Sequence, residues 1–242
     1  MLTWPQDFPT NFQFLLRWLH FLGGITWIGM LYWFNLVNVK VQKDLDGAIK
    51  GRVNLNVIPK TLWWFRWGAM LTWFTGFIYF YYLIDGEKTG HMPLVHFVVG
   101  WAIAFIVLAA FYRVSVAGGP LKDGRVLAIV IAVVVIFISY AVALMAHNVG
   151  SSSRVISIEV GGGLGTIMFL NVWMIIWPLQ KKILAATRAT VEAGAAAPTE
   201  LPAWARRAFL ASRTNAWLSI PMLFFMGAAS HFPIFSTKVT LP

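Results

Sequence analysis

The sequence predicts an all-α, polytopic integral membrane protein: a helical bundle of about six transmembrane helices with both termini outside. Of its 242 residues, 59% are hydrophobic and only 12% are charged, which is more apolar surface than a soluble domain of this length can bury. Six apolar stretches are long enough to cross the ~30 Å hydrocarbon core of a bilayer. We therefore interpret the whole chain, 1–242, as a single multi-pass membrane domain.

The predicted spans are separated by polar or charged connections. They cover residues 12–37, 62–83, 94–112, 126–147, 158–179 and 216–235. The first is interrupted by Arg17 and His20, and the fourth is the least interrupted. The fifth has a Gly-rich outer half, and the sixth contains Pro221, which favours a kink. Residues 193–215 are predicted to form a flexible Ala- and Pro-rich linker and then a short amphipathic helix on the inner membrane interface.

The basic residues indicate the orientation of the spans. The connections after the first, third and fifth spans hold 14 of the 19 Lys and Arg residues. The opposite side holds only Lys88, Arg154 and Lys238. By the positive-inside rule the 14 lie in the cytoplasm, which fits a multi-pass protein of the bacterial inner membrane. The same distribution accounts for the net charge of +10 without a nucleic-acid partner.

Histidines are the candidate chemistry-bearing residues. All five lie in the outer half of the predicted bundle: His20, His91, His96, His147 and His231. His20 is ~12 Å deep at 1.5 Å per helical residue, and ionisable residues at such depth suggest a function. Neutral imidazole ligates haem iron. The absence of Cys excludes disulfides, thiolate metal sites and covalently attached c-type haem. We therefore expect one or two haem b groups.

Four of these histidines are the candidate iron ligands, and small or basic residues beside them are candidate haem contacts. The ligands are His20, His96, His147 and His231; the contacts are Gly23, Gly24, Gly227 and Arg17. Glycines leave room for the macrocycle, and Arg17 or Arg154 suits its propionates. The alternatives are that small residues serve helix packing, that His91 and His147 are interfacial, or that the site binds zinc or copper. Against zinc or copper, the sequence has no H-x-x-x-H spacing. Glu159 is either a proton relay or cation site, or an interfacial carboxylate.

Three runs resemble a known family. They are Leu16–Asn38, Leu62–Phe80 and Arg213–Pro233. They are similar to the membrane domain of bacterial membrane-bound urate hydroxylases, the urate oxidase N-terminal family. The element formed by His20, Trp27 and Gly29 also looks like the first helix of other small haem- or copper-associated membrane proteins.

The resemblance implies an integral-membrane oxidase of urate that passes electrons to cytochrome c rather than to oxygen. Full-length family members carry a C-terminal cytochrome c domain, and we expect this chain to lack one, because the sequence stops at Pro242 and has no Cys. The implied partner is therefore a separate cytochrome c, soluble or membrane-anchored, on the outer face.

The leading hypothesis is thus a urate-hydroxylase-like, haem-dependent membrane oxidoreductase, surrounded by lipid, with no catalytic residue assigned. The first alternative is a non-catalytic or electron-relay subunit, bound to other membrane subunits of a larger respiratory or photosynthetic complex. The second is a transporter or channel, against which stands the lack of internal repeats or paired broken helices.

Overall fold

The computed structural model describes residues 5, 7–87 and 89–235, and every regular element among them is helical. The elements are α1 (Phe8–Tyr32), η1 (Trp33–Asn38), α2 (Val39–Asp44), α3 (Gly47–Asp85), α4 (Met92–Ala117), η2 (Pro120–Lys122), α5 (Gly124–Asn148), α6 (Ser153–Leu170), η3 (Asn171–Ile176), α7 (Trp177–Ala193) and α8 (Leu201–His231). The all-α prediction is confirmed. Lys88 and Lys238, used above for orientation, lie outside the described residues.

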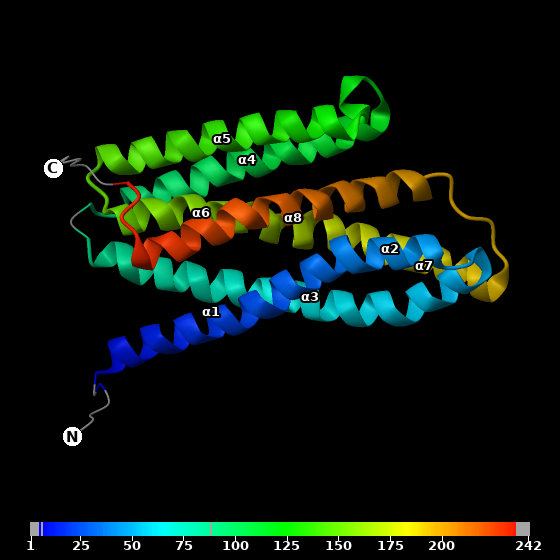
Figure 1. Ribbon diagram of the computed structural model, residues 1–242, viewed down its shortest axis with the longest axis horizontal. Coiled ribbons are helices and arrows are strands. Elements are labelled where there is room, and N and C mark those ends of the chain that lie inside the picture. The colour runs from blue at the N-terminus through cyan, green and yellow to red at the C-terminus, as the bar shows by residue number, and fades with distance from the viewer. Residues whose placement is uncertain (1–4, 6, 88, 236–242) are drawn as a thin grey trace.

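Four continuous helical stretches have the length and apolar composition needed to cross a membrane. They are Phe8–Asp44, Met92–Ala117, Gly124–Asn148 and Ser153–Ala193. Helices α3 and α8 run alongside them (Figure 1). The outward side chains of α5 are large and apolar, such as Ile136, 67% exposed, and Phe137, 69% exposed. Trp101 and Tyr112 on α4 are fully buried. Apolar residues thus fill the core and also cover the outer surface, as expected of a helical bundle solvated by lipid.

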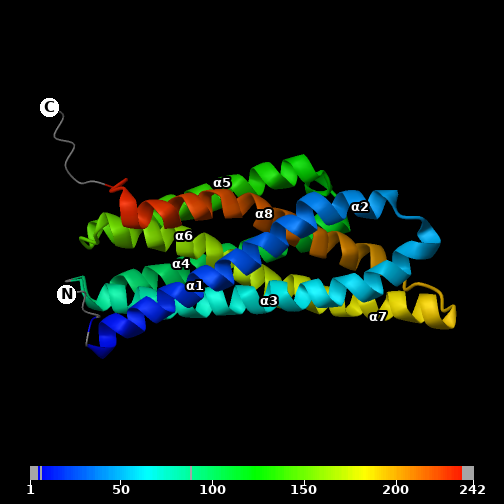
Figure 2. The ribbon, with the colours of Figure 1, turned by 60° about the horizontal axis from the view of Figure 1, so that its bottom comes forward.

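The bundle has two chemically different ends (Figures 1 and 2). At the histidine end, as we call it, α1 begins, α3 ends and α8 ends near the connection between α5 and α6. At the opposite, basic end lie the connections 45–46, 118–123 and 194–200. Most of the Lys and Arg residues lie on the parts of the helices that adjoin these connections. Helix α1 packs mainly along α3, α6 packs along α8, and α4 pairs with α5.

Two long helices each contain a π-helical segment. Segment η1 joins α1 to α2, and η3 joins α6 to α7, without a break in the helix. Each contains a buried Asn: Asn35 donates to the carbonyl oxygen of Leu31 at 2.9 Å, and Asn171 donates to Oδ1 of Asn215 at 2.8 Å. The wider π turn therefore places a polar side chain inside the bundle at each position.

Residues 193–215 differ from their predicted structure. The linker ends sooner, because α8 begins at Leu201 and continues to His231 as one helix. The expected interfacial helix is therefore the first part of α8, running along the bundle rather than across its end (Figure 1). Ala208, 2% exposed, and Ala211, 0% exposed, explain the difference, because these small residues are packed inside the bundle. The amphipathic pattern reflects protein contact on one face, not lipid contact alone.

Candidate cofactor site

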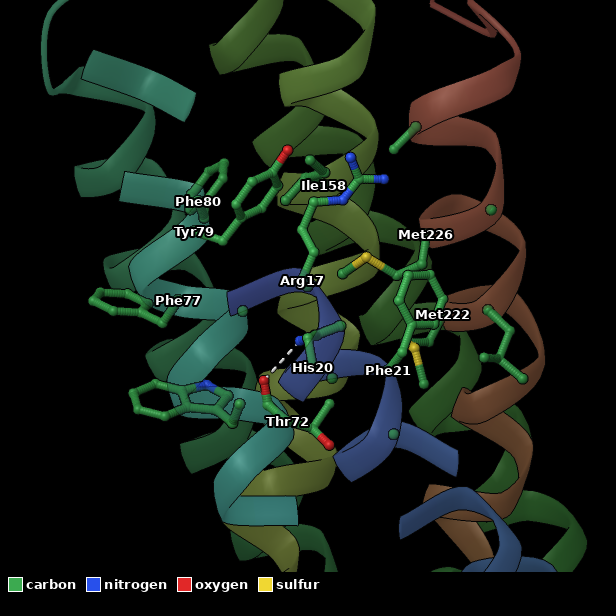
Figure 3. A pocket seen from close by; sticks show the side chains of 18 of the residues that line it. Arg17, His20, Phe21, Thr72, Phe77, Tyr79, Phe80, Ile158, Met222 and Met226 are labelled. Atoms are coloured by element: carbon green, nitrogen blue, oxygen red, sulfur yellow. Dashed lines mark hydrogen bonds between the residues drawn. The ribbon is translucent and has the colours of Figure 1, made fainter. Parts of the chain in front are cut away.

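A cavity of about 580 Å³ lies at the histidine end between α1, α3, α6 and α8 (Figure 3). Its wall is mostly aromatic and aliphatic; the aromatic residues are Phe21, Trp27, Trp73, Phe77, Tyr79, Phe80 and Phe97. Ligand-binding pockets in proteins typically measure ~300–1,000 Å³ and combine such walls with a few polar groups. The cavity therefore has the size and chemistry of a site for a largely apolar ligand.

His20 lines the cavity from α1 (Figure 3). Its Nδ1 lies 2.8 Å from the carbonyl oxygen of Thr72 on α3. Because a carbonyl oxygen only accepts, Nδ1 carries the hydrogen and Nε2 keeps its lone pair. Histidines that ligate metals commonly have this arrangement, in which the second nitrogen is held by a carbonyl or carboxylate. His20 is thus prepared to act as a ligand through Nε2.

A glycine on α3 makes room for the His20 ring. A Cβ atom added at Gly76 would lie 2.7 Å from both Cε1 and Nδ1 of His20, well inside the 3.5–4.0 Å of favourable contact. Helix α3 therefore fixes the imidazole twice, with the Thr72 carbonyl on one atom and the bare backbone of Gly76 against the ring.

The three glycines predicted to border a haem have different roles. Gly23 lies at the crossing of α1 and α3, where an added Cβ would lie 2.7 Å from Thr72 Oγ1 and 3.2 Å from the carbonyl oxygen of Gly68. Gly24 and Gly227 line the cavity. A Cβ on Gly24 would meet only Thr72 Cγ2 at 3.8 Å, and one on Gly227 would meet nothing within 4 Å. Gly23 thus brings the helices together, whereas Gly24 and Gly227 leave space in the cavity.

Two arginines stand at the rim of the cavity. Arg154 donates from Nη2 to the hydroxyl oxygen of Tyr79 at 2.7 Å, and the Arg17 guanidinium lies 5.8 Å from the centre of the Tyr79 ring. Neither forms an ion pair with a carboxylate of the described residues. The ion pair among these residues joins Arg188 to Glu192 on α7. Two cations without an acidic partner, next to an apolar cavity, favour a ligand with an anionic group.

The structure brings two of the four candidate ligands to this cavity. His231, the last residue of α8, lies at the rim with Arg17 and Arg154, while His20 lies in the wall. His96 and His147 are not among the lining residues. His96 is half-buried on α4, with an Nδ1 that has no hydrogen-bond partner, and His147 is exposed near the end of α5. Iron ligation by these two stays a prediction.

Three further residues, His91, Arg66 and Glu159, are not among those that line the cavity. The His91 ring stacks on Tyr81 with centres 5.8 Å apart. The Arg66 guanidinium lies 3.9 Å from the centre of the Trp177 ring, in contact with protein rather than reaching into solvent. Glu159 is fully buried on α6, next to the cavity-lining Ile158, and neither carboxylate oxygen has a hydrogen-bond partner.

Sequence reasoning missed the contribution of α3. Thr72, Gly76 and Tyr79 supply the carbonyl, the space and the hydroxyl that position His20 and Arg154. The available signal was the spacing of Gly68, Thr72 and Gly76 at four-residue intervals, which places small residues on one helical face, as at close helix crossings in membranes. Among the described residues no three His, Asp or Glu side chains gather as a metal site, so the zinc or copper alternative gains no support.

Comparison with known proteins gives one match. The family described as urate oxidase N-terminal matches residues 47–240. The matched range begins at α3, so α1, with Arg17 and His20, precedes it. No curated protein and no solved structure matches the chain.

Proposed function

From the premise that the chain belongs to the urate oxidase N-terminal family, we propose that it is a urate-hydroxylase-like membrane oxidoreductase. In this proposal the cavity holds haem b and passes electrons to a cytochrome c. The observation that supports it best is His20, whose Nδ1 is held 2.8 Å from the Thr72 carbonyl oxygen so that Nε2 is available for iron.

The residues around the cavity fit the parts of a haem. The aromatic wall suits the flat macrocycle, and Gly24 and Gly227 leave space beside it. Arg17 and Arg154 suit the propionates, as charge-assisted donors at the rim. Bound haem would supply one-electron chemistry. The chain itself would ligate the iron through His20, with His231 as the candidate second ligand. Arg17 and Arg154 would hold the propionate carboxylates, and the apolar wall would exclude water.

The orientation of the bundle decides where electrons leave. We place the basic end in the cytoplasm by the positive-inside rule, and hence the cavity near the outer face of a bacterial inner membrane. A partner that accepts electrons from this cavity then docks outside. Asp85, exposed at the histidine end, is available to a basic cytochrome c, whereas Glu87 accepts a hydrogen bond from the backbone nitrogen of Ser152 at 3.1 Å.

An optical spectrum of the purified protein tests the proposal. Protein from haem-replete cells should carry a non-covalent haem that acidic acetone extracts, and His20→Ala should lose it. His91→Ala is the matched control and should retain haem, because His91 stacks on Tyr81 away from the cavity. Colourless wild-type protein would refute the cofactor. If haem is present, adding urate and cytochrome c separates an enzyme from an electron-relay subunit.

A further inference from the structure

The wall of the cavity is incomplete on one side. Phe21 and Ile25 on α1 and Leu223 on α8 all line the cavity, yet they are 62%, 71% and 46% exposed. In both views of the bundle, the half of α1 nearest the histidine end leans along α3 and away from α8 (Figures 1 and 2). With the bundle oriented as proposed above, these residues lie within the bilayer, where the surface of the protein meets hydrocarbon rather than water. The cavity therefore opens sideways, toward the lipid.

We propose that haem enters the cavity through this side opening, from the membrane, rather than through the polar rim at the histidine end. The inference rests on the proposed function, because it concerns the route of the same cofactor. We call the opening, bordered by Phe21, Ile25 and Leu223, the lateral portal.

The chemistry of the two routes favours the portal. Passage through the rim would take an apolar macrocycle between Arg17 and Arg154 and would disturb the hydrogen bond from Arg154 to Tyr79. Desolvating charged groups in this way is costly. Passage through the portal keeps the macrocycle in an apolar environment throughout. The propionates can stay at the level of the headgroups until they reach the arginines.

The helices that border the portal are each held by a close crossing with a different neighbour. Helix α1 is held against α3 by the crossing at Gly23, and α8 is held against α6 at Gly161, where an added Cβ would lie 3.2 Å from the Met226 nitrogen. The side chains of Met222 and Met226, two α8 residues at the Gly161 crossing, form part of the cavity wall. Methionine side chains are unbranched and adapt readily to a new neighbour. Passage in this proposal requires side chains at the portal to rotate, and not the helices to separate.

Single-cysteine variants test the route, because the chain has no Cys of its own. Haem-free Ile25→Cys protein is placed in liposomes, labelled with a bulky membrane-permeant maleimide and mixed with haem. The rate and the final extent of the Soret absorbance are then recorded. We expect uptake at least tenfold slower than before labelling. The same label at Ile129→Cys, on the lipid-facing side of α5 and 65% exposed, should change neither the rate nor the final extent. Ser230→Cys, at the rim, labelled with an impermeant maleimide, should leave the rate within about twofold.

The outcomes separate the route from the cofactor. Unlabelled protein that takes up no haem would overturn the proposed function and, with it, the portal. Normal uptake by unlabelled protein with no slowing after labelling at Ile25→Cys would overturn the portal alone. Slowing after labelling at Ser230→Cys but not at Ile25→Cys would assign the route to the rim. A loss of final occupancy without a change in rate would likewise overturn the portal, because the label would then block the site and not the path.

Discussion

Substituting Gly76 by Ala perturbs the proposed iron ligand without removing it. The added Cβ would lie 2.7 Å from Cε1 and Nδ1 of His20, and a normal carbon contact needs about 3.5 Å or more. The ring must therefore move by roughly 1 Å. A shift of that size away from α3 would stretch the 2.8 Å separation of Nδ1 and the Thr72 carbonyl oxygen beyond about 3.5 Å, where a hydrogen bond is effectively lost.

The expected consequence is weaker haem binding with the fold retained. Loss of such a supporting hydrogen bond typically lowers metal affinity by about 10–100-fold. Overpacking of this kind costs about 1–3 kcal/mol of stability. The assay is titration of haem-free Gly76→Ala protein with haem, followed at the Soret band, together with thermal unfolding. Gly47→Ala makes the same change at the other end of α3, where an added Cβ meets nothing within 4 Å, and should bind haem as the wild type does. Wild-type affinity in Gly76→Ala would refute ligation by His20 held in this position.

Three further expectations concern charge and orientation. Arg154→Gln should weaken haem binding about tenfold, as expected for loss of a charge-assisted hydrogen bond. Arg17→Gln should have a smaller effect because Arg17 is exposed. If Arg154→Gln binds haem as tightly as the wild type in a titration, Arg154 does not bind a propionate. A cysteine at the exposed Ala195 should react with impermeant maleimide only from the cytoplasmic side, and labelling from outside would reverse the orientation. Asp85→Lys should slow reduction of added cytochrome c by outside-out vesicles in a salt-dependent way without displacing haem; unchanged transfer would remove Asp85 from the docking surface.

Hydropathy predicted where the helices lie better than it predicted how they end. Apolar stretches of about 20 residues identified the parts that lipid surrounds, because that requirement is local in the sequence. The continuation of α8 through Ala208 and Ala211 depends on contacts with other helices, which the local sequence pattern does not reveal. The local pattern of residues 203–215 therefore predicts a helix whose polar face meets headgroups. In the structure the other face of this helix is packed inside the bundle.

Residue counting assigns each histidine a depth along its predicted span but no direction around the bundle. Counting residues along each predicted span places His20, His96, His147 and His231 in the outer half of the bundle. Helix packing then separates them, since His20 and His231 reach the cavity and the other two do not. The partners of His20 lie on α3, 52 and 56 positions away in the chain, and a pairing between helices has no signature in one sequence. The same limit made the adjacent Gly23 and Gly24 look equivalent, although only Gly24 lines the cavity.

The π-helical segments have a consequence for how the chain can change in length. A π turn holds about one residue more than the α-helix that would replace it. Deleting one residue within Asn171–Ile176 would therefore let α6 and α7 join as regular α-helix. Gly162 and Thr166 would stay on the cavity and Leu179 would stay in the core. The same deletion at another point between Thr166 and Leu179 would rotate everything beyond it by about 100°. Relatives that differ here by a single residue should thus keep the same faces, and an alignment should place that gap inside η3.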